Sequence, residues 1–295
     1  NTEVGKRTSF RAMLDEFRRS LMRELDYRQE ARNLSTLGAN LARFSGILVP
    51  SPVPDFVTQR VLTMEFVHGR KVTAIGPLAR MELNGAPLAE ELCEAYLHQI
   101  LVDGFFHADP HPGNIFLTDD GRLAFLDLGM VAHIGPSMQE TLLQLVMAIS
   151  EGRGENVADL MLEIGTPVAE VDHDAITREI VQLVLQVQGM SLRDIALGRL
   201  LFNASRIASD GGYRMPRELT MLSKTLLNVD EVARRLDPDF DPNAAIRRNA
   251  AKITRDRMLK SFSPGRMFDS VLEFKSLFEK LPRRLNQLAD AVVDN

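Results

Sequence analysis

The chain has 295 residues, of which 45% are apolar and 25% charged, and its formal net charge is −5. This composition is typical of a globular protein with a sizeable core, and the acidic balance and absence of Trp argue against nucleic acid as a partner. A single cysteine, Cys93, excludes an internal disulfide framework, and no apolar run approaches the roughly 18 residues that span a bilayer.

Near the start of the chain, residues 8–43 have the pattern of one long helix. Apolar side chains recur there at spacings of three and four and form a single stripe: Phe10, Leu14, Phe17, Leu21 and Leu25. The first glycines that could end this helix are Gly38 and Gly46. Three prolines between positions 50 and 54 then require extended chain.

The next elements are short strands and another helix. Residues 56–67 are rich in β-branched and aromatic side chains, which predicts two short strands that end before Gly69. Residues 88–103 have apolar positions on one side and predict a helix that stops at Gly104.

A β-hairpin follows, and the rest of the chain is helical in pattern. Residues 115–117 and 123–126 are short apolar segments, and the intervening Thr-Asp-Asp-Gly is typical of a turn. From residue 136 onward the helical pattern is interrupted only by glycines and prolines. Strands confined to the first half and a helical bulk after them predict an α+β, predominantly helical fold.

The most informative stretch is 106–114, which reads Phe-His-Ala-Asp-Pro-His-Pro-Gly-Asn. Its prolines and glycine indicate a stiff loop that holds polar side chains in fixed directions. Asn114 directly precedes the first hairpin strand and Asp127 directly follows the second, so the hairpin brings both to one end. Together with Asp109, these oxygen-bearing side chains suit Mg²⁺, which takes few protein ligands plus phosphate oxygens.

Simpler interpretations exist for the same residues. Asp and Asn are common in turns, so Asp109, Asn114 and Asp127 taken singly could be turn residues. The His-x-Asp-x-His spacing of His107 and His111 is that of metallohydrolase clusters. No further His-rich motif completes a closed site, which favours structural roles for both histidines.

The spacing Asp-x4-Asn, a hairpin, then Asp-x-Gly is the order of the catalytic and metal loops of protein kinases. In that scheme Asp109 is catalytic and orients the phosphate acceptor. Asn114 and Asp127 bind the metal that bridges the phosphates of the nucleotide. The hinge, whose backbone meets the adenine edge, would contain three residues of the β-rich segment: Met64, Glu65 and Val67.

Two motifs carry a resemblance to a known family. The string at 106–114, followed by Leu-Asp-Leu-Gly at 126–129, resembles the signature of the UbiB/AarF atypical protein-kinase-like family. Residues 24–31 are similar to the family's Glu-x-Asp motif and C-helix glutamate, and Leu-Asp-Pro-Asp-Phe at 236–240 is a weaker match. The resemblance covers about residues 10–245. It implies a protein-kinase-like large lobe with the C-helix and the last strands of the small lobe.

The resemblance also assigns roles in cofactor binding to three acidic residues. Glu24 and Asp26 would form the Glu-x-Asp pair, and Glu30 would pair with the nucleotide-binding lysine; a solvated helix face is the alternative. The family's Lys-x-Gly-Gln helix, Ala-rich loop and strand lysine lie upstream of the C-helix and are absent from this sequence. Lys71 cannot replace that lysine because it follows the hinge. We therefore expect a C-terminal part of a longer protein, in which Glu30 lacks its partner and ATP binding is weak.

This organisation implies three parts: a partial small lobe (1–67), a helical large lobe with the catalytic loop and metal hairpin (68–245), and a basic amphipathic helical tail (246–295). The tail has 11 Lys/Arg and 6 Asp/Glu, a balance of +5, which leaves −10 for residues 1–245. A basic amphipathic helix can lie on an anionic membrane, but more often it packs on its own domain, which we favour.

The resemblance implies an ATP- and Mg²⁺-dependent kinase or ATPase that supports ubiquinone or other isoprenoid-lipid biosynthesis. Its partners would be nucleotide, a prenyl lipid or quinone precursor and the biosynthetic enzymes, in the cytoplasm or at the inner face of the membrane. One alternative is a pseudokinase scaffold that uses nucleotide as a switch. Another is a metal-dependent hydrolase that uses four residues: His107, Asp109, His111 and Asp127.

Overall fold

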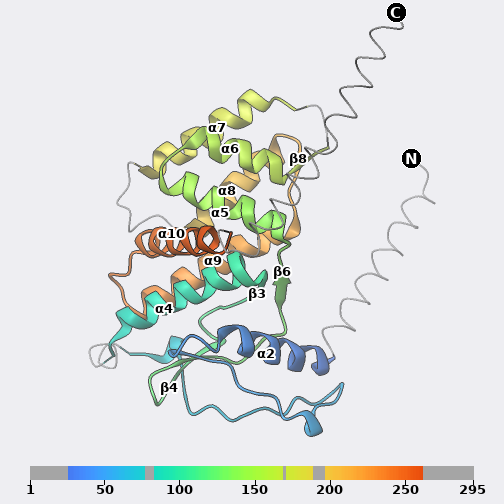
Figure 1. Cartoon of the computed structure of the whole chain (residues 1–295), viewed down its shortest axis with the longest axis vertical. Helices are drawn as coiled ribbons and strands as arrows, with labels where there is room; N and C mark the ends of the chain where they lie inside the picture. The colour runs from blue at the N-terminus through green and yellow to red at the C-terminus, as the bar shows by residue number, and fades with distance from the viewer. Residues whose placement is uncertain (1–25, 77–82, 169–170, 189–196, 262–295) are drawn as a thin grey trace, which may run out of the picture. The chain divides into compact units, whose positions relative to one another are not determined.

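The structure, a computed structural model, describes residues 26–76, 83–168, 171–188 and 197–261 (Figure 1). Helices make up most of these residues: α2 (Tyr27–Leu41), α4 (Gly85–His98), α5 (Pro136–Ser150), α6 (Gly154–Ile164), α7 (His173–Gln188), α8 (Leu197–Asp210), α9 (Arg217–Leu236) and α10 (Pro242–Ser261). The expected α+β, predominantly helical class is therefore confirmed. The described residues up to Ala250 belong to one compact unit.

A four-stranded sheet contains the predicted hairpin. Its strand order is β1 (Ile47–Leu48), β5 (Leu123–Phe125), β4 (Ile115–Thr118) and β2 (Gly69–Lys71). β4 and β5 are antiparallel with Ile115 opposite Phe125, and both side chains are fully buried. Gly121 has a φ of 84° in the turn, a conformation that glycine adopts without strain. The hairpin prediction is thus confirmed.

A second strand pair brackets the hairpin. β3 (Phe105–His107) precedes the 108–114 loop and pairs antiparallel with β6 (Val131–His133), which follows the hairpin. The loop and the segment after β5 are therefore held between two strand pairs. A third pair, β7 (Thr166–Pro167) with β8 (Tyr213–Arg214), lies among the helices, so the prediction that strands are confined to the first half is wrong.

Within the described residues, the helix predicted over 8–43 begins only at Tyr27. Asp26 has extended backbone (φ −101°, ψ 92°), and its side chain accepts a hydrogen bond from the Arg28 amide, so it is the N-cap of α2. A continuous helix through position 26 is therefore wrong, because a capping aspartate competes with helix continuation. Residues 1–25 lie outside the described part of the chain.

The two strands predicted within 56–67 are also wrong. The segment begins at the last residue of the short helix η1 (Pro54–Phe56), and its β pairing is one isolated bridge, from Met64 to Pro52. The prolines before it have no N–H to donate, so a regular ladder cannot form. Phe56 and Phe66 are exposed, at 65% and 82%, so their β propensity has no core to pack against.

The helix predicted over 88–103 is confirmed, with one irregularity. α4 continues into the π-helical turn η3 (Gln99–Asp103), which ends at Gly104 with a φ of 64°. Gln99 in this turn is fully buried, so the turn directs a polar side chain into the core. α4 packs against α9, and the two helices lie side by side in Figure 1.

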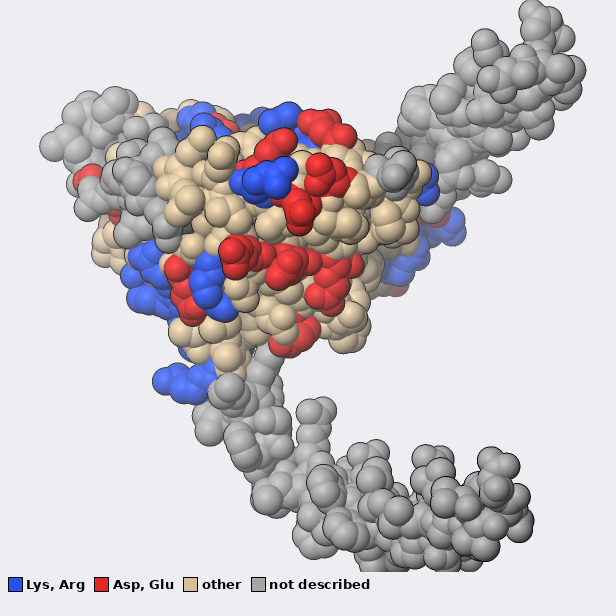
Figure 2. Space-filling model, turned by 90° about the horizontal axis from the view of Figure 1, so that it is seen from above, with Lys and Arg blue, Asp and Glu red and all other residues tan. Residues whose placement is uncertain are grey.

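One face of the unit carries a group of acidic side chains. Acidic side chains gather on the face formed by α6 and α7, where Figure 2 shows them in a row across the surface. The exposed acidic residues of these two helices are Glu155, Asp159, Glu163, Asp174 and Glu179. No helix within the described ranges is long and apolar enough to cross a bilayer.

Only the start of the predicted tail is described. Ile246 and Ala250 are buried, and Arg248 forms an ion pair with Glu90 over 2.7 Å, so this part of α10 packs on the unit. Residues 262–295 lie outside the described part of the chain, and both interpretations of the tail remain predictions there.

Candidate functional site

Asn114 and Asp127 lie at the same end of the β4–β5 hairpin. The Leu126 amide donates a hydrogen bond to the Asn114 carbonyl over 3.4 Å, and Asp127 is the next residue. The Asp127 side chain is exposed, and its Oδ1 accepts a hydrogen bond from the Gly129 amide over 3.0 Å. The hairpin therefore brings a carboxamide and an accessible carboxylate to one end of the sheet.

Turn hydrogen bonds shape the loop between β3 and β4. The His111 amide donates to the Asp109 carbonyl, and the Asn114 amide donates to the His111 carbonyl, each over 2.8 Å. The Ala108 amide donates to the Met130 carbonyl over 2.9 Å and so extends the pairing of β3 with β6. The loop is thus anchored at its start to the segment that follows Asp127.

The Asp109 carboxylate is engaged by helix α9. Lys224 Nζ lies 2.9 Å from Asp109 Oδ1, and Asn228 Nδ2 donates to the same oxygen over 3.2 Å. Thr225 Oγ1 donates to the Ala108 carbonyl over 2.9 Å. A helix more than 100 residues away in sequence therefore holds the loop residue that the kinase-like spacing assigns to catalysis.

The two histidines of the loop differ in environment. His107 is 1% exposed; its amide donates to Gln99 Oε1 over 3.0 Å, and its Nδ1 donates to the Met130 carbonyl over 3.3 Å. Burial lowers the pKa of His107 to about 4, although the Met130 carbonyl opposes the shift. His111 is exposed, and its Nδ1 accepts a hydrogen bond from the Gly113 amide. These contacts give both histidines structural partners.

The donor set at the hairpin end suits a hard cation completed by phosphate. Carboxylate and carboxamide oxygens are the ligands that Mg²⁺ takes, and it commonly keeps only one or two from the protein. Among the residues that the structure describes, no three His, Cys, Asp or Glu side chains are grouped to hold a metal ion. Asn114 and Asp127 are thus the residues at the hairpin end that could hold a metal ion completed by phosphate oxygens.

Helix α2 is bonded to the same region from the other side. The Leu128 amide donates to Glu30 Oε1 over 3.3 Å, and Asn33 Nδ2 donates to the Leu128 carbonyl over 2.8 Å. Burial and then the nearby Asp127 carboxylate raise the pKa of Glu30, and the Leu128 amide opposes them. Within the described ranges, no lysine or arginine forms an ion pair with Glu30.

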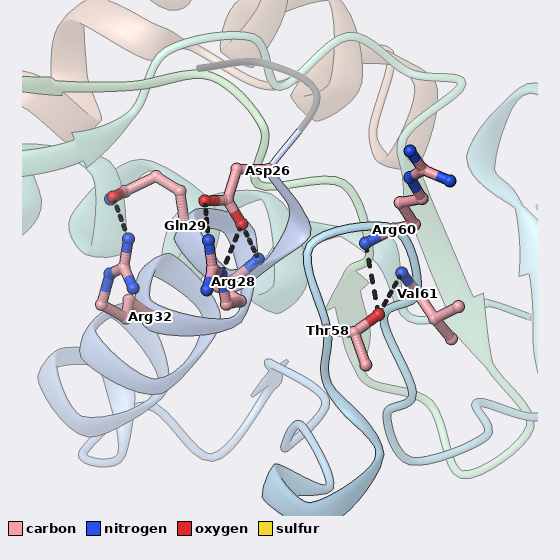
Figure 3. Close-up of polar contacts among 7 residues, drawn as sticks. All are labelled: Asp26, Arg28, Gln29, Arg32, Thr58, Arg60 and Val61. Atoms are coloured by element: carbon pink, nitrogen blue, oxygen red, sulfur yellow. Dashed lines mark hydrogen bonds and ion pairs between the residues drawn. The ribbon is translucent and has the colours of Figure 1, made fainter. Parts of the chain in front are cut away.

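Asp26 has a partner of its own. Its carboxylate accepts from Nε and Nη2 of Arg28 over 2.9 and 2.8 Å, and this guanidinium is the main cause that lowers the pKa of Asp26 (Figure 3). The Tyr27 amide donates to the Gln59 carbonyl, which joins the start of α2 to the neighbouring 58–61 turn. Glu24, the other member of the predicted pair, lies outside the described residues.

The predicted hinge runs as an irregular segment. Thr58 Oγ1 accepts from the amides of Arg60 and Val61 in the turn before it (Figure 3). The Glu65 amide donates to the Ser51 carbonyl over 2.9 Å, and the contact of this residue with adenine stays a prediction. Met64 and Val67 are half-buried neighbours of that residue, and their contact with adenine remains a prediction.

Several contributors to this region were not predicted from the sequence: Asn33, Gln99, Lys224, Thr225 and Asn228. The sequence gives a weak indication for Asn33. It is a polar residue three positions after Glu30, on the helix face that also carries buried leucines. The α9 residues gave no signal, since only the tertiary fold brings them to the loop.

Comparisons with known proteins cover most of the chain. Residues 2–161 match the ABC1 atypical kinase-like domain, and residues 180–241 match the UbiB helical domain. The chain is 30% identical to Protein ACTIVITY OF BC1 COMPLEX KINASE 8, chloroplastic, of Arabidopsis thaliana, over 86% of this chain and 37% of that protein. It is 29% identical to the Probable protein kinase UbiB of Pseudomonas fluorescens, over 94% of this chain and 52% of that protein.

A solved structure shares the fold. The complex of Rv3197 with erythromycin from Mycobacterium tuberculosis has a TM-score of 0.51 at 23% identity, over 76% of this chain and 57% of that one. At that identity the likeness concerns the fold alone. The chain spans 37% to 59% of the length of the curated relatives it matches.

Proposed function

Because the chain belongs to the ABC1 atypical kinase-like family, of which UbiB is a member, we propose that it binds ATP with Mg²⁺ and catalyses phosphoryl transfer or ATP hydrolysis. The proposal rests on the contacts at the end of the β4–β5 hairpin. There the Leu126 amide, just before Asp127, donates to the Asn114 carbonyl, and the Leu128 amide, just after Asp127, donates to Glu30 Oε1 of helix α2. These contacts between the hairpin end and helix α2 support the proposal.

Each residue has a separate task in this proposal. Asp109 orients the acceptor hydroxyl or water and takes its proton. Asn114 and Asp127 would hold Mg²⁺, which supplies charge neutralisation at the phosphates when bound. Glu30 would pair with a nucleotide-binding lysine, and Met64 and Val67 would line the adenine edge. Placement and electrostatics account for most of the catalysis in such sites.

The biological setting follows from the family resemblance. We propose a role in ubiquinone or other isoprenoid-lipid biosynthesis, with a prenyl lipid or quinone precursor or its biosynthetic enzymes as partners. Contact with the inner face of the membrane would be peripheral.

One observation favours a second candidate, a nucleotide-switched scaffold without turnover. Glu30 has a raised pKa and no cationic partner within the described ranges. If this glutamate were also unpaired in the full-length protein, the site would lack one of the contacts that hold nucleotide phosphates for transfer.

Thermal unfolding of the full-length natural protein tests the proposal. ATP with Mg²⁺ at 100 times its Kd should stabilise the fold by about 2.7 kcal/mol. Asp127→Asn should remove this stabilisation, whereas Asp119→Asn, an exposed aspartate in the turn at the opposite end of the hairpin, should keep it.

The outcomes separate the candidates. Stabilisation that is lost in Asp127→Asn, with hydrolysis lost in Asp109→Asn, supports the enzyme. Stabilisation without hydrolysis, unchanged by Asp109→Asn, supports the scaffold. Stabilisation by Zn²⁺ but not by nucleotide contradicts both and favours the metal-dependent hydrolase.

A further inference from the structure

Helix α9 brings a cation to the catalytic loop. Lys224 Nζ is 2.9 Å from Asp109 Oδ1, and Asn228, one helical turn later, donates to the same oxygen. Residues four apart share one helix face, so both side chains reach the loop together. Asp109 lies in the region that matches the kinase-like domain, and α9 lies in the region that matches the helical domain. The site is therefore built from both regions.

The backbone of α9 is fixed against the loop. Thr225 is fully buried, and its hydroxyl donates to the carbonyl of Ala108, the residue before Asp109. Leu222 and Val229 on the same helix are also buried. Lys224 Cα thus has a defined position relative to Asp109, whereas the Lys224 side chain is 57% exposed and can move.

Stability does not explain this ion pair. The side chain of Lys224 is 57% exposed and that of Asp109 is 23% exposed, and a pair with one exposed partner typically contributes about 1 kcal/mol or less. On the same helix, Arg235 is paired locally with Glu231, one turn away. Lys224 instead reaches across to a loop carboxylate that the kinase-like spacing places beside the acceptor. A cation at that place is positioned for charge that develops during transfer.

We propose that Lys224 is a catalytic cation that helix α9 supplies to the transferred phosphoryl group. The inference rests on the proposed function. Before the nucleotide binds, Lys224 holds Asp109. During transfer, the acceptor oxygen forms a bond to the γ-phosphorus and the bond from that phosphorus to the bridging oxygen breaks. Its electron pair leaves with ADP, and the acceptor proton passes to Asp109.

Distances support this role. The acceptor oxygen must lie within about 3 Å of the Asp109 carboxylate to transfer its proton. The phosphorus must lie within about 3.5 Å of that oxygen in a productive complex. Lys224, at 2.9 Å from Asp109, therefore needs only a side-chain rotation to contact a phosphoryl oxygen. Asn228 keeps Asp109 in place when the lysine moves.

The test compares affinities rather than activity alone. Calorimetry measures the Kd of Mg²⁺–ADP with and without aluminium fluoride, which mimics the transferring phosphoryl group, in the full-length natural protein. The variants are Lys224→Met, which keeps the aliphatic stem but removes the charge, and Lys224→Arg, which keeps the charge. Arg235→Met is the matched control, because it removes an exposed cation from the same helix.

Lys224→Met should bind Mg²⁺–ADP as the natural protein does but lose about tenfold or more of the affinity gained with aluminium fluoride, since one charged hydrogen bond is missing. Lys224→Arg should recover most of the gain, and Arg235→Met should not differ from the natural protein. kcat for ATP hydrolysis should fall in Lys224→Met while KM changes little.

Two results would overturn the inference in distinguishable ways. If the natural protein binds Mg²⁺–ADP and gains affinity with aluminium fluoride but Lys224→Met keeps the full gain, the lysine has no such role and the proposed function stands. If the natural protein binds neither species, the proposed function fails and the inference fails with it.

Discussion

Glu30 Oε1 accepts a hydrogen bond from the backbone amide of Leu128, 98 residues later in the chain, over 3.3 Å. Asn33 donates to the carbonyl of the same leucine, so helix α2 contacts both polar groups of one peptide residue. Leu128 follows Asp127 directly. The position of α2 and the position of the Asp127 segment are therefore coupled through two hydrogen bonds.

This contact predicts the effect of Glu30→Gln. Because burial raises the pKa of Glu30 in the folded state, the charged form destabilises the fold once the pH rises above the ordinary value of 4.5. Glutamine can still accept from Leu128, so we expect the variant to be more stable at pH 7, by about 1 kcal/mol or less, and equal at pH 4. Urea unfolding at the two pH values measures this.

Glu65→Gln is the control for that experiment. Glu65 is an exposed glutamate that also accepts from a backbone amide, that of Ser51 over 2.9 Å. It should show no gain at pH 7. A gain of equal size in both variants, or a loss in Glu30→Gln, would contradict the assigned cause.

His107 predicts a loss of stability in mild acid. Its folded pKa is about 4, below the ordinary 6.5, so between these values the unfolded chain takes up a proton that the folded chain does not. As the pH drops from 6.5 to 4, protonation of His107 in the unfolded chain should lower the free energy of unfolding by up to about 3 kcal/mol.

His107→Phe should flatten the dependence of stability on pH between 7 and 5. It should also lower stability at pH 7 by about 1 kcal/mol or less, because the Met130 carbonyl loses one of its two donors and keeps the Ala108 amide. If the free energy of unfolding changes with pH equally in the variant and the natural protein across this range, His107 is not the titrating group.

Asp26 can be tested for two roles at once. Because Asp26 is the N-cap of α2, Asp26→Ala should lower the free energy of unfolding by about 1 kcal/mol. Asp26→Asn should change it little, since asparagine also caps helices. If Asp26 also serves the proposed nucleotide site, Asp26→Asn should raise the Kd of Mg²⁺–ATP while thermal stability stays the same. Unchanged affinity in Asp26→Asn would restrict this residue to capping.

Gly85 predicts a packing effect between two helices. A Cβ at this first residue of α4 would overlap the Leu236 carbonyl at the end of α9. Gly85→Ala should therefore destabilise the fold by about 1–3 kcal/mol in chemical denaturation. At Gly76 a Cβ would meet no atom within 4 Å, so Gly76→Ala should have no comparable effect.

Local chemistry was enough to predict the hairpin and most of the helices. The turn at 118–121 and the apolar segments beside it determine β4 and β5, and glycine determines the end of the helix at Gly104. The strands predicted in 56–67 failed because composition does not reveal that these side chains are exposed. The helix expected through Asp26 failed because apolar periodicity masks a capping residue.

The polar contacts of the site were only partly predictable. Asp109, Asn114 and Asp127 stand at positions that a short-range motif fixes. The bonds from Asn33, Lys224 and Asn228 join segments about 95 to 119 residues apart, and depend on how α2 and α9 pack. No pattern within a single segment carries that information.

The central claim is that Asn114 and Asp127 share one divalent cation with the phosphates of a nucleotide. A crystal structure with Mn²⁺ and a non-hydrolysable ATP analogue, located by the anomalous signal of the metal, tests it most directly. We predict one ion bonded to the Asn114 side-chain oxygen, an Asp127 carboxylate oxygen and the phosphates, beside Asp109. An ion bound only by His107 or His111, or a nucleotide bound away from the hairpin end, would contradict the account.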